Sequence, residues 1–211
     1  MSGRKAIRFW PLAVLAVLAC IGVFVGCDGG AVKAPTTFKT WNAKDGSFSI
    51  QYPTDWKAEG GGQHGIQWAE FSKGRAKISV KVNLTSSLVG DIAGSAGQLG
   101  GIDGAEIDPK LQEQLAPVAA AHGVSVDLFA DEVPNFKEQE PVAFQSRLGD
   151  SRKSEFTASS GVGSQVRGYR ATALTSQKGV HVVCRCPNAH WKTLQPAFDQ
   201  MLTSLTLGTP Q

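Results

Sequence analysis

Alternation of apolar and polar residues predicts a series of β-strands between residues 48 and 186. The clearest run is 76–84, in which Ala76, Ile78, Val80 and Val82 are separated by polar residues, the pattern of a strand with one buried face. On similar grounds we predict strands over residues 48–52, 66–71, 142–148, 154–158, 166–175 and 180–186. Turn residues closely separate most of these runs, so we expect hairpins and an antiparallel sheet.

Helical spacing replaces this alternation near the C-terminus. Trp191, Leu194, Phe198, Leu202 and Leu205 recur at the period of an amphipathic helix, which we expect to lie on the sheet. Strands with helices between and after them indicate an α+β fold, in which an antiparallel β-sheet is flanked by helices.

A second helix is predicted after the glycine-rich stretch 86–104. Asp108 would cap it, Pro109 would occupy its first position, Pro117 would kink it and Gly123 would end it. The stretch 86–104 itself is expected to form a loop or a weak helical turn, because glycine is costly in regular elements.

The first 26 residues have the composition of an export signal. Arg4, Lys5 and Arg8 precede an apolar stretch from Phe9 to Val25, as in a signal peptide. The following Gly26-Cys27 pair resembles the cleavage site of bacterial lipoproteins, which implies that Cys27 is acylated and anchors the chain in a lipid bilayer.

Other interpretations of this segment stay open. Cys20 is a second candidate for acylation, but cleavage there would leave an apolar start. An uncleaved membrane anchor and free secretion are also compatible with the pattern. All of them predict that residues 27–211 face the periplasm or the cell exterior, with 27–37 as a flexible tether and 38–211 as the folded domain.

Removal of the signal changes the charge of the chain. The whole sequence has 21 Lys and Arg against 18 Asp and Glu. Three of the basic residues and none of the acidic ones precede Cys27, so the exported part is formally neutral. This argues against nucleic acid as a partner, since phosphate binding needs a basic surface. We therefore expect recognition by shape and apolar contact more than by charge.

Short stretches of the exported part resemble the PsbP/Mog1-like superfamily, whose bacterial members include small lipoproteins of the DcrB and LpqN kind. The resemblance lies in residues 45–56, in 168–172, in Pro196-Ala197-Phe198 and in Ser204-Leu205. It implies an α/β/α sandwich and a non-enzymatic role in binding or assembling other proteins. No functional residue of the superfamily transfers to this sequence.

Motifs for the common catalytic classes are missing. The sequence has no GxSxG elbow, P-loop, GxGxxG or HExxH motif, so no cofactor and no enzymatic activity is expected. The close carboxylates Glu138 and Glu140, and also Asp131 and Glu132, are interpreted as solvated faces and not as acid–base pairs.

One cluster has chemical interest, namely His181, Cys184, Cys186 and His190. In a strand, Cys184 and Cys186 would share a face and His181 would lie on the other. The favoured interpretation is two buried free thiols. The alternatives are a distorted disulfide and a soft-metal site formed by Cys184, Cys186 and His190.

Trp41, Trp56 and Trp68 complete the candidates, either as core residues or as anchors on a partner surface. The sequence therefore predicts a membrane-tethered lipoprotein that acts as a protein-interaction or envelope-assembly module. The alternative is a lipoprotein that binds a small ligand or a soft metal through the glycine-rich stretch or the cysteine region.

Overall fold

The computed structural model describes residues 32–63, 65–84, 117–130, 134–159, 163–175 and 177–208. The signal, Cys20, Cys27, the glycine-rich stretch, the Asp108-Pro109 cap and the Asp131/Glu132 pair lie outside these residues. Among the described helices, none is long and apolar enough to cross a membrane.

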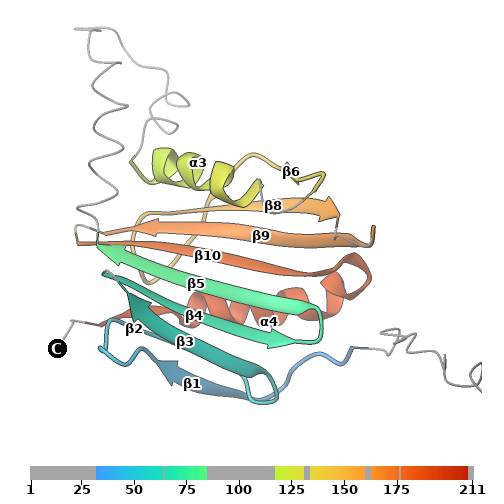
Figure 1. The fold of residues 1–211 in the computed structure, drawn as a ribbon, viewed down its shortest axis with the longest axis horizontal. Helices are drawn as coiled ribbons and strands as arrows, with labels where there is room; N and C mark the ends of the chain where they lie inside the picture. The colour runs from blue at the N-terminus through green and yellow to red at the C-terminus, as the bar shows by residue number, and fades with distance from the viewer. Residues whose placement is uncertain are drawn as a thin grey trace, which may run out of the picture. The chain divides into compact units, whose positions relative to one another are not determined.

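An eight-stranded antiparallel sheet organises the domain (Figure 1). Its strand order is β3-β4-β5-β10-β9-β8-β6, and β7 also pairs with β8. The strands are β3 Lys57–Gln63, β4 Ile66–Lys73, β5 Ala76–Leu84, β6 Lys137–Glu138, β7 Val142–Ala143, β8 Ser151–Ser159, β9 Gln165–Leu174 and β10 Lys178–Pro187. The predicted antiparallel α+β fold is confirmed.

A smaller three-stranded sheet has the order β1-β2-β11, with β1 Phe38–Asn42, β2 Phe48–Pro53 and β11 Thr206–Leu207. Buried Lys178 at the start of β10 links the two sheets. Its ammonium donates to the carbonyl of Gly208, at 2.6 Å, and to that of Ser47, at 3.2 Å. Val32, in the segment expected to be a tether, packs against the core.

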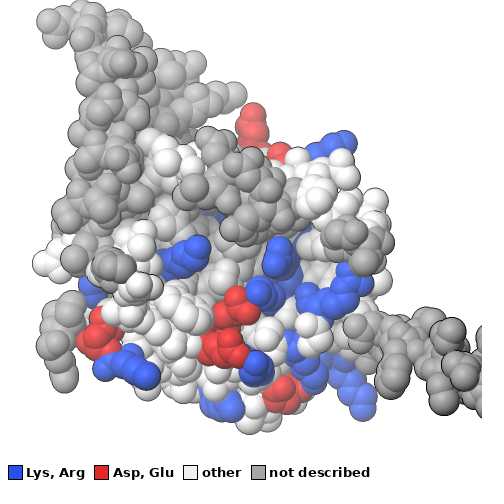
Figure 2. Space-filling view, in the orientation of Figure 1, with Lys and Arg blue, Asp and Glu red and all other residues white. Residues whose placement is uncertain are grey.

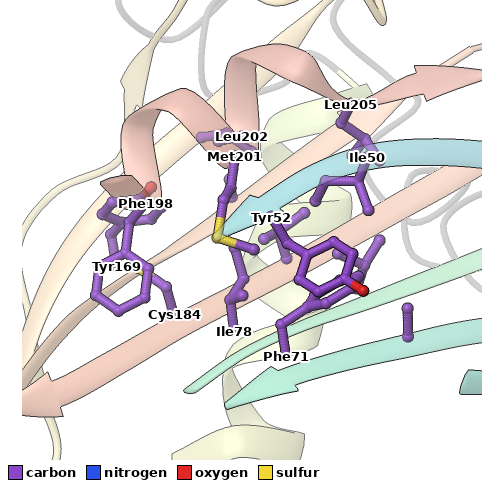
Figure 3. Close-up of a cluster of buried hydrophobic side chains, with 14 of the residues drawn as sticks. Ile50, Tyr52, Phe71, Ile78, Tyr169, Cys184, Phe198, Met201, Leu202 and Leu205 are labelled. Atoms are coloured by element: carbon purple, nitrogen blue, oxygen red, sulfur yellow. The ribbon is translucent and has the colours of Figure 1, made fainter. Parts of the chain in front are cut away.

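The main core lies between the large sheet and helix α4, Trp191–Ser204, which follows the short 3-10 helix Asn188–His190. In Figure 1 this helix lies behind the strands. Alternate residues of β4, β5, β9 and β10 meet it and the strand β2, because strand side chains alternate between faces. Figure 3 shows part of this core, with labelled side chains Ile50, Tyr52, Phe71, Ile78, Tyr169, Cys184, Phe198, Met201, Leu202 and Leu205.

Helix α3, Pro117–Ala130, packs on the opposite face of the sheet, against β8 and β9. The prediction that Gly123 ends a helix was wrong, because α3 runs through it. Pro117 occupies the first position of α3, where its missing N–H costs no hydrogen bond. Nothing lies within 4 Å of a methyl group placed on Gly123, so this glycine marks an open helix surface and not a helix end.

One strand prediction also needs correction, and several of the described strands were not predicted. Of the stretch 142–148, only Val142–Ala143 is a strand. The chain then turns, with Ser146 accepting from the amide of Leu148 at 3.1 Å. Strand β3 was not predicted, because Gly60, Gly61 and Gly62 give it no apolar alternation.

Candidate functional site

A buried polar cluster joins α3 to the large sheet. His122 of α3 is fully buried, and its ring lies between two hydroxyl groups on neighbouring strands. Its Nδ1 is 2.9 Å from Thr172 Oγ1, and its Nε2 is 2.8 Å from Ser154 Oγ. The sheet residues meet the helix because β8 and β9 place them on the face opposite α4.

An ion pair closes one side of this cluster. Arg170 of β9 donates to Glu138 Oε1 at 2.6 Å and to Oε2 at 3.0 Å. The same guanidinium donates to Ser125 Oγ at 2.7 Å and to the His122 carbonyl at 3.2 Å. Arg170 thus ties the helix to β6. The expectation that Glu138 is solvated was wrong, since 14% of its side chain is exposed, whereas Glu140 is exposed.

The hydrogen bonds of the cluster form a continuous series in which each donor group points towards Glu138. The hydroxyl of Ser154 donates to Glu138 Oε1, which also accepts from Arg170. That hydroxyl then accepts from His122 Nε2, because its own hydrogen is used. Nδ1 of neutral His122 consequently accepts from Thr172.

The last member of this hydrogen-bonded series is His181 of β10. Thr172 Oγ1, which has given its hydrogen to His122, accepts from His181 Nδ1 at 3.3 Å. The Nε2 atom of neutral His181 is therefore an acceptor. The hydrogen-bond network thus assigns both histidine tautomers.

Electrostatics keep both rings neutral. The pKa of His122 is lowered to about 4, chiefly by burial and next by the charge of Arg170. The pKa of His181 is also lowered to about 4, by burial and then by the charges of Arg170 and Lys81. The imidazolium form is unfavourable at both sites, which agrees with the assigned tautomers.

The cluster contains a serine, a histidine and a carboxylate, but their arrangement is not that of a nucleophile. In a serine hydrolase the acid orients the histidine from the nitrogen that does not face the serine. Here Thr172 occupies that nitrogen, and the serine lies between the histidine and the acid. Ser154 is 2% exposed, so a substrate has no access to it. The geometry supports a structural role for these three groups.

A groove opens beside the cluster, between α3 and the strands β4, β5 and β10. Its volume is about 440 Å³. His181 and Arg170 line it together with Lys81, Arg185, Ile66 and Val124, among others. The hydrogen-bonded series of buried side chains therefore ends at His181, on the wall of an open groove. Figure 2 shows the molecule in the orientation of Figure 1, with Lys and Arg side chains spread over the visible face.

A second hollow, of about 550 Å³, lies near the end of α4. It is lined by polar side chains such as Gln51, Gln145 and Gln200, and Arg147 is the only charged residue among them. No buried polar side chain is among its lining residues. We therefore take the groove beside α3 as the candidate site.

The cysteines predicted from the sequence lie elsewhere. Cys184 and Cys186 are free and fully buried on the α4 side, and burial raises the pKa of Cys186 to about 12. His181 lies on the opposite face, as expected from strand alternation, and His190 belongs to the short 3-10 helix. Among the described residues, no group of three or more His, Cys, Asp and Glu could hold a metal ion.

Two of the three tryptophans belong to the core or pack against it, as expected for core residues. Trp56 is buried, and Trp41 packs on Phe48 and Phe71. Trp68 is 38% exposed on the face that carries the groove. Sequence reasoning missed His122, Ser154, Arg170 and Thr172. The signal available was polar residues at alternate positions of strands whose other face is apolar.

Comparison with known proteins gives the fold. No family model matches the sequence, and no curated protein matches it. Among solved structures, the cyanobacterial PsbP (CyanoP) of Synechocystis sp. PCC 6803 matches with a TM-score of 0.52 and 12% identity. The match covers 86% of this chain and 96% of that one.

Two further structures are more distant. A protein of unknown function from Pseudomonas aeruginosa has 12% identity and a TM-score of 0.44, covering 83% of this chain and 100% of its own. LpqN, involved in cell envelope biogenesis of Mycobacterium tuberculosis, has 11% identity and a TM-score of 0.43, covering 82% and 91%. The fold assignment thus rests on the cyanobacterial structure, and the folded part of this chain has the PsbP-like fold that the sequence resemblance predicted.

Proposed function

We propose that this protein is a non-enzymatic binding module, tethered to a membrane outside the cytoplasm through acylated Cys27, which holds a small ligand in the groove beside α3. The observation that carries the proposal is the groove itself. Its volume of about 440 Å³ lies within the usual range of small-molecule sites, roughly 300–1,000 Å³. It also combines apolar walls with charged and polar groups, as such sites do.

The walls of the groove support a binding role. Ile66 is 41% exposed and Val124 is 49% exposed, and both line the groove. Asn83 also lines it, and the side-chain oxygen of this residue is buried without a hydrogen-bond partner. A ligand with a donor group would satisfy that oxygen and cover the two apolar side chains.

Blocking the groove tests the proposal. Ser79 lies on its floor, directly opposite Val183 of β10, so Ser79→Trp would fill it without altering charge. Full-length protein is extracted from membranes in mild detergent, and molecules released on denaturation are identified by mass spectrometry. We expect a small molecule that accompanies the wild type and Lys192→Trp, a control on exposed α4 surface, but not Ser79→Trp. Equal recovery from the two variants, or no recovery from the wild type, would refute the proposal.

A protein partner is the second candidate, favoured by the exposed Trp68 beside the groove. Exposed aromatic side chains are frequent anchors of protein interfaces. A photo-reactive amino acid at position 68 of the full-length chain would then form one discrete protein adduct in envelope extracts. Under the small-ligand proposal, no protein adduct is expected at this position.

The membrane tether has its own test. Mass spectrometry of the mature N-terminus should find a chain that begins at Cys27 and carries acyl groups, because two lipid signals give stable anchoring. A chain that begins at Met1, or an unmodified Cys27, would contradict the anchor but leave the groove proposal untouched.

A further inference from the structure

The charge of the groove is unbalanced. Four cations, Lys77, Lys81, Arg170 and Arg185, line it. Lys77 pairs with Glu70 at 2.8 Å, and the Arg170–Glu138 pair was described above. Two positive charges, those of Lys81 and Arg185, have no carboxylate partner among the described residues.

Strand pairing places these two charges on one floor. Lys81 of β5 lies directly opposite His181 of β10, and Arg185 of β10 lies directly opposite Lys77 of β5. All four side chains project to the same face, because they are separated by even numbers along each strand and face one another across it. Lys77 and Arg185 are like charges directly opposite each other, an arrangement that destabilises a sheet, and Glu70 already pairs with Lys77. Arg185 has no such carboxylate among the described residues, so a bound negative charge would compensate it.

The pKa of His181 is affected by positive charges that line the groove. After burial, the charges of Arg170 and Lys81 lower its pKa. A proton on this ring is repelled by cations that line the groove, so an anion placed there would be attracted by the same field.

We infer that the groove binds a small molecule that carries a phosphate or carboxylate group on Lys81 and Arg185 and an apolar part against Ile66 and Val124. This inference rests on the proposed function. It departs from the expectation, drawn from the neutral net charge of the exported part, that recognition depends on shape and apolar contact more than on charge. Net charge averages over the chain, whereas the sheet places both of these cations on the wall of one groove.

The probes are phenyl phosphate and benzoate, which combine an anion with an apolar ring, together with inorganic phosphate and benzyl alcohol, which have only one of the two. Calorimetric titration of the full-length protein in detergent measures their affinities. We expect phenyl phosphate or benzoate to bind more tightly than inorganic phosphate and benzyl alcohol. The affinity should fall as salt is added, because salt screens exposed charges.

Charge-matched variants decide the location. Lys81→Gln and Arg185→Gln should each weaken the tighter of the two anionic probes about tenfold, the scale of one charge-assisted hydrogen bond. Lys192→Gln removes the same charge from the exposed surface of α4 and should leave the affinity unchanged.

A second readout is independent of affinity. Bound anion should raise the pKa of His181, followed by NMR of labelled histidine side chains and assigned by loss of the signal in His181→Asn. The side-chain signals of His190, which does not line the groove, should not change when the anion binds.

The inference is overturned if neither anionic probe binds at millimolar concentration, if benzyl alcohol binds as tightly as they do, or if Lys81→Gln and Arg185→Gln bind like the wild type. These failures can be told from failure of the proposed function. If the anionic probes fail but the wild type still co-purifies with a small molecule that Ser79→Trp lacks, the groove binds a ligand that is not anionic.

Discussion

Both carboxylate oxygens of Glu138 accept hydrogen bonds from the guanidinium of Arg170, which lies 32 positions further along the chain. Arg170 is 3% exposed, so this carboxylate is the counter-charge of a buried cation. Because Arg170 also donates to the His122 carbonyl and to Ser125, the pair joins the two-residue strand β6 to the helix α3. Loss of this ion pair should therefore lower the free energy of unfolding and also weaken the attachment of α3 to the sheet.

Glu138→Gln should destabilise the fold by about 3 kcal/mol, because removal of one partner leaves a buried charge uncompensated. Urea unfolding followed by circular dichroism measures the change. Glu140→Gln, an exposed neighbour that removes the same charge, should have an effect close to zero. Equal effects of the two variants would show that Glu138 is in fact solvated.

Stability should fall as the pH falls from about 6.5 to about 4. The pKa of His122 is about 4 in the folded chain against the ordinary value of 6.5, so the unfolded state binds protons more readily in this range. The stabilisation is complete above pH 6.5 and is lost toward the folded pKa, roughly 3 kcal/mol for this residue. The charges around His122 are Arg170, Glu138 and Arg152, and His181 adds to them when protonated.

Urea midpoints measured across this pH range test the sign. The double variant His122→Gln/His181→Gln should show a flatter profile of stability against pH, because it lacks both histidines. Some slope should remain, because carboxylates that titrate at lower pH are present in both proteins. An unchanged slope in the double variant would assign the pH dependence to groups other than the histidines.

Two glycine substitutions should have opposite effects. A methyl group on Gly168 would collide with the carbonyl oxygen of Cys184 and lie 2.7 Å from Phe156 Cζ, so Gly168→Ala should cost about 2 kcal/mol or more. Gly123→Ala adds a methyl group to an open helix surface and should stabilise by about 0.5–1 kcal/mol. Thermal unfolding of both variants provides the comparison, and a loss of stability in Gly123→Ala would contradict the helix assignment.

The thiols of Cys184 and Cys186 should be unreactive in the folded protein. Burial raises the pKa of both, so little thiolate forms at neutral pH. Alkylation followed by mass spectrometry of the peptide that contains both residues should show little label in native protein and two labels after unfolding. Rapid labelling in the native state would mean that the α4 side opens, and detection of a disulfide would revive that alternative.

Sequence patterns were sufficient for the elements that have one apolar face. The alternation in β5 and the helical spacing in α4 reflect burial against the same core, so both were predicted with nearly correct bounds. Pattern analysis failed where the stabilising contacts are polar or distant in sequence. Strand β3 has three glycines and no apolar alternation, and α3 was predicted to end at Gly123.

The candidate site was largely invisible in the sequence for the same reason. His122, Ser154, Arg170 and Thr172 come from three separate elements, and nothing in their spacing indicates that they meet. Glu138 next to Glu140 has the pattern of a solvated face, and only the pairing of β6 with β8 brings its carboxylate to Arg170. In contrast, the face shared by Cys184 and Cys186 depends on one strand alone and was predicted correctly.

The polar attachment of α3 has a thermodynamic consequence. Among the side chains of α3 that the structure describes, His122 hydrogen-bonds to Thr172 and Ser154, and Ser125 accepts from Arg170, with Val118 and Ala121 buried beside them. These polar contacts depend on distance and angle, so a small displacement of the helix weakens several of them together. The α3 segment should therefore exchange its amide hydrogens through local opening below the free energy of global unfolding.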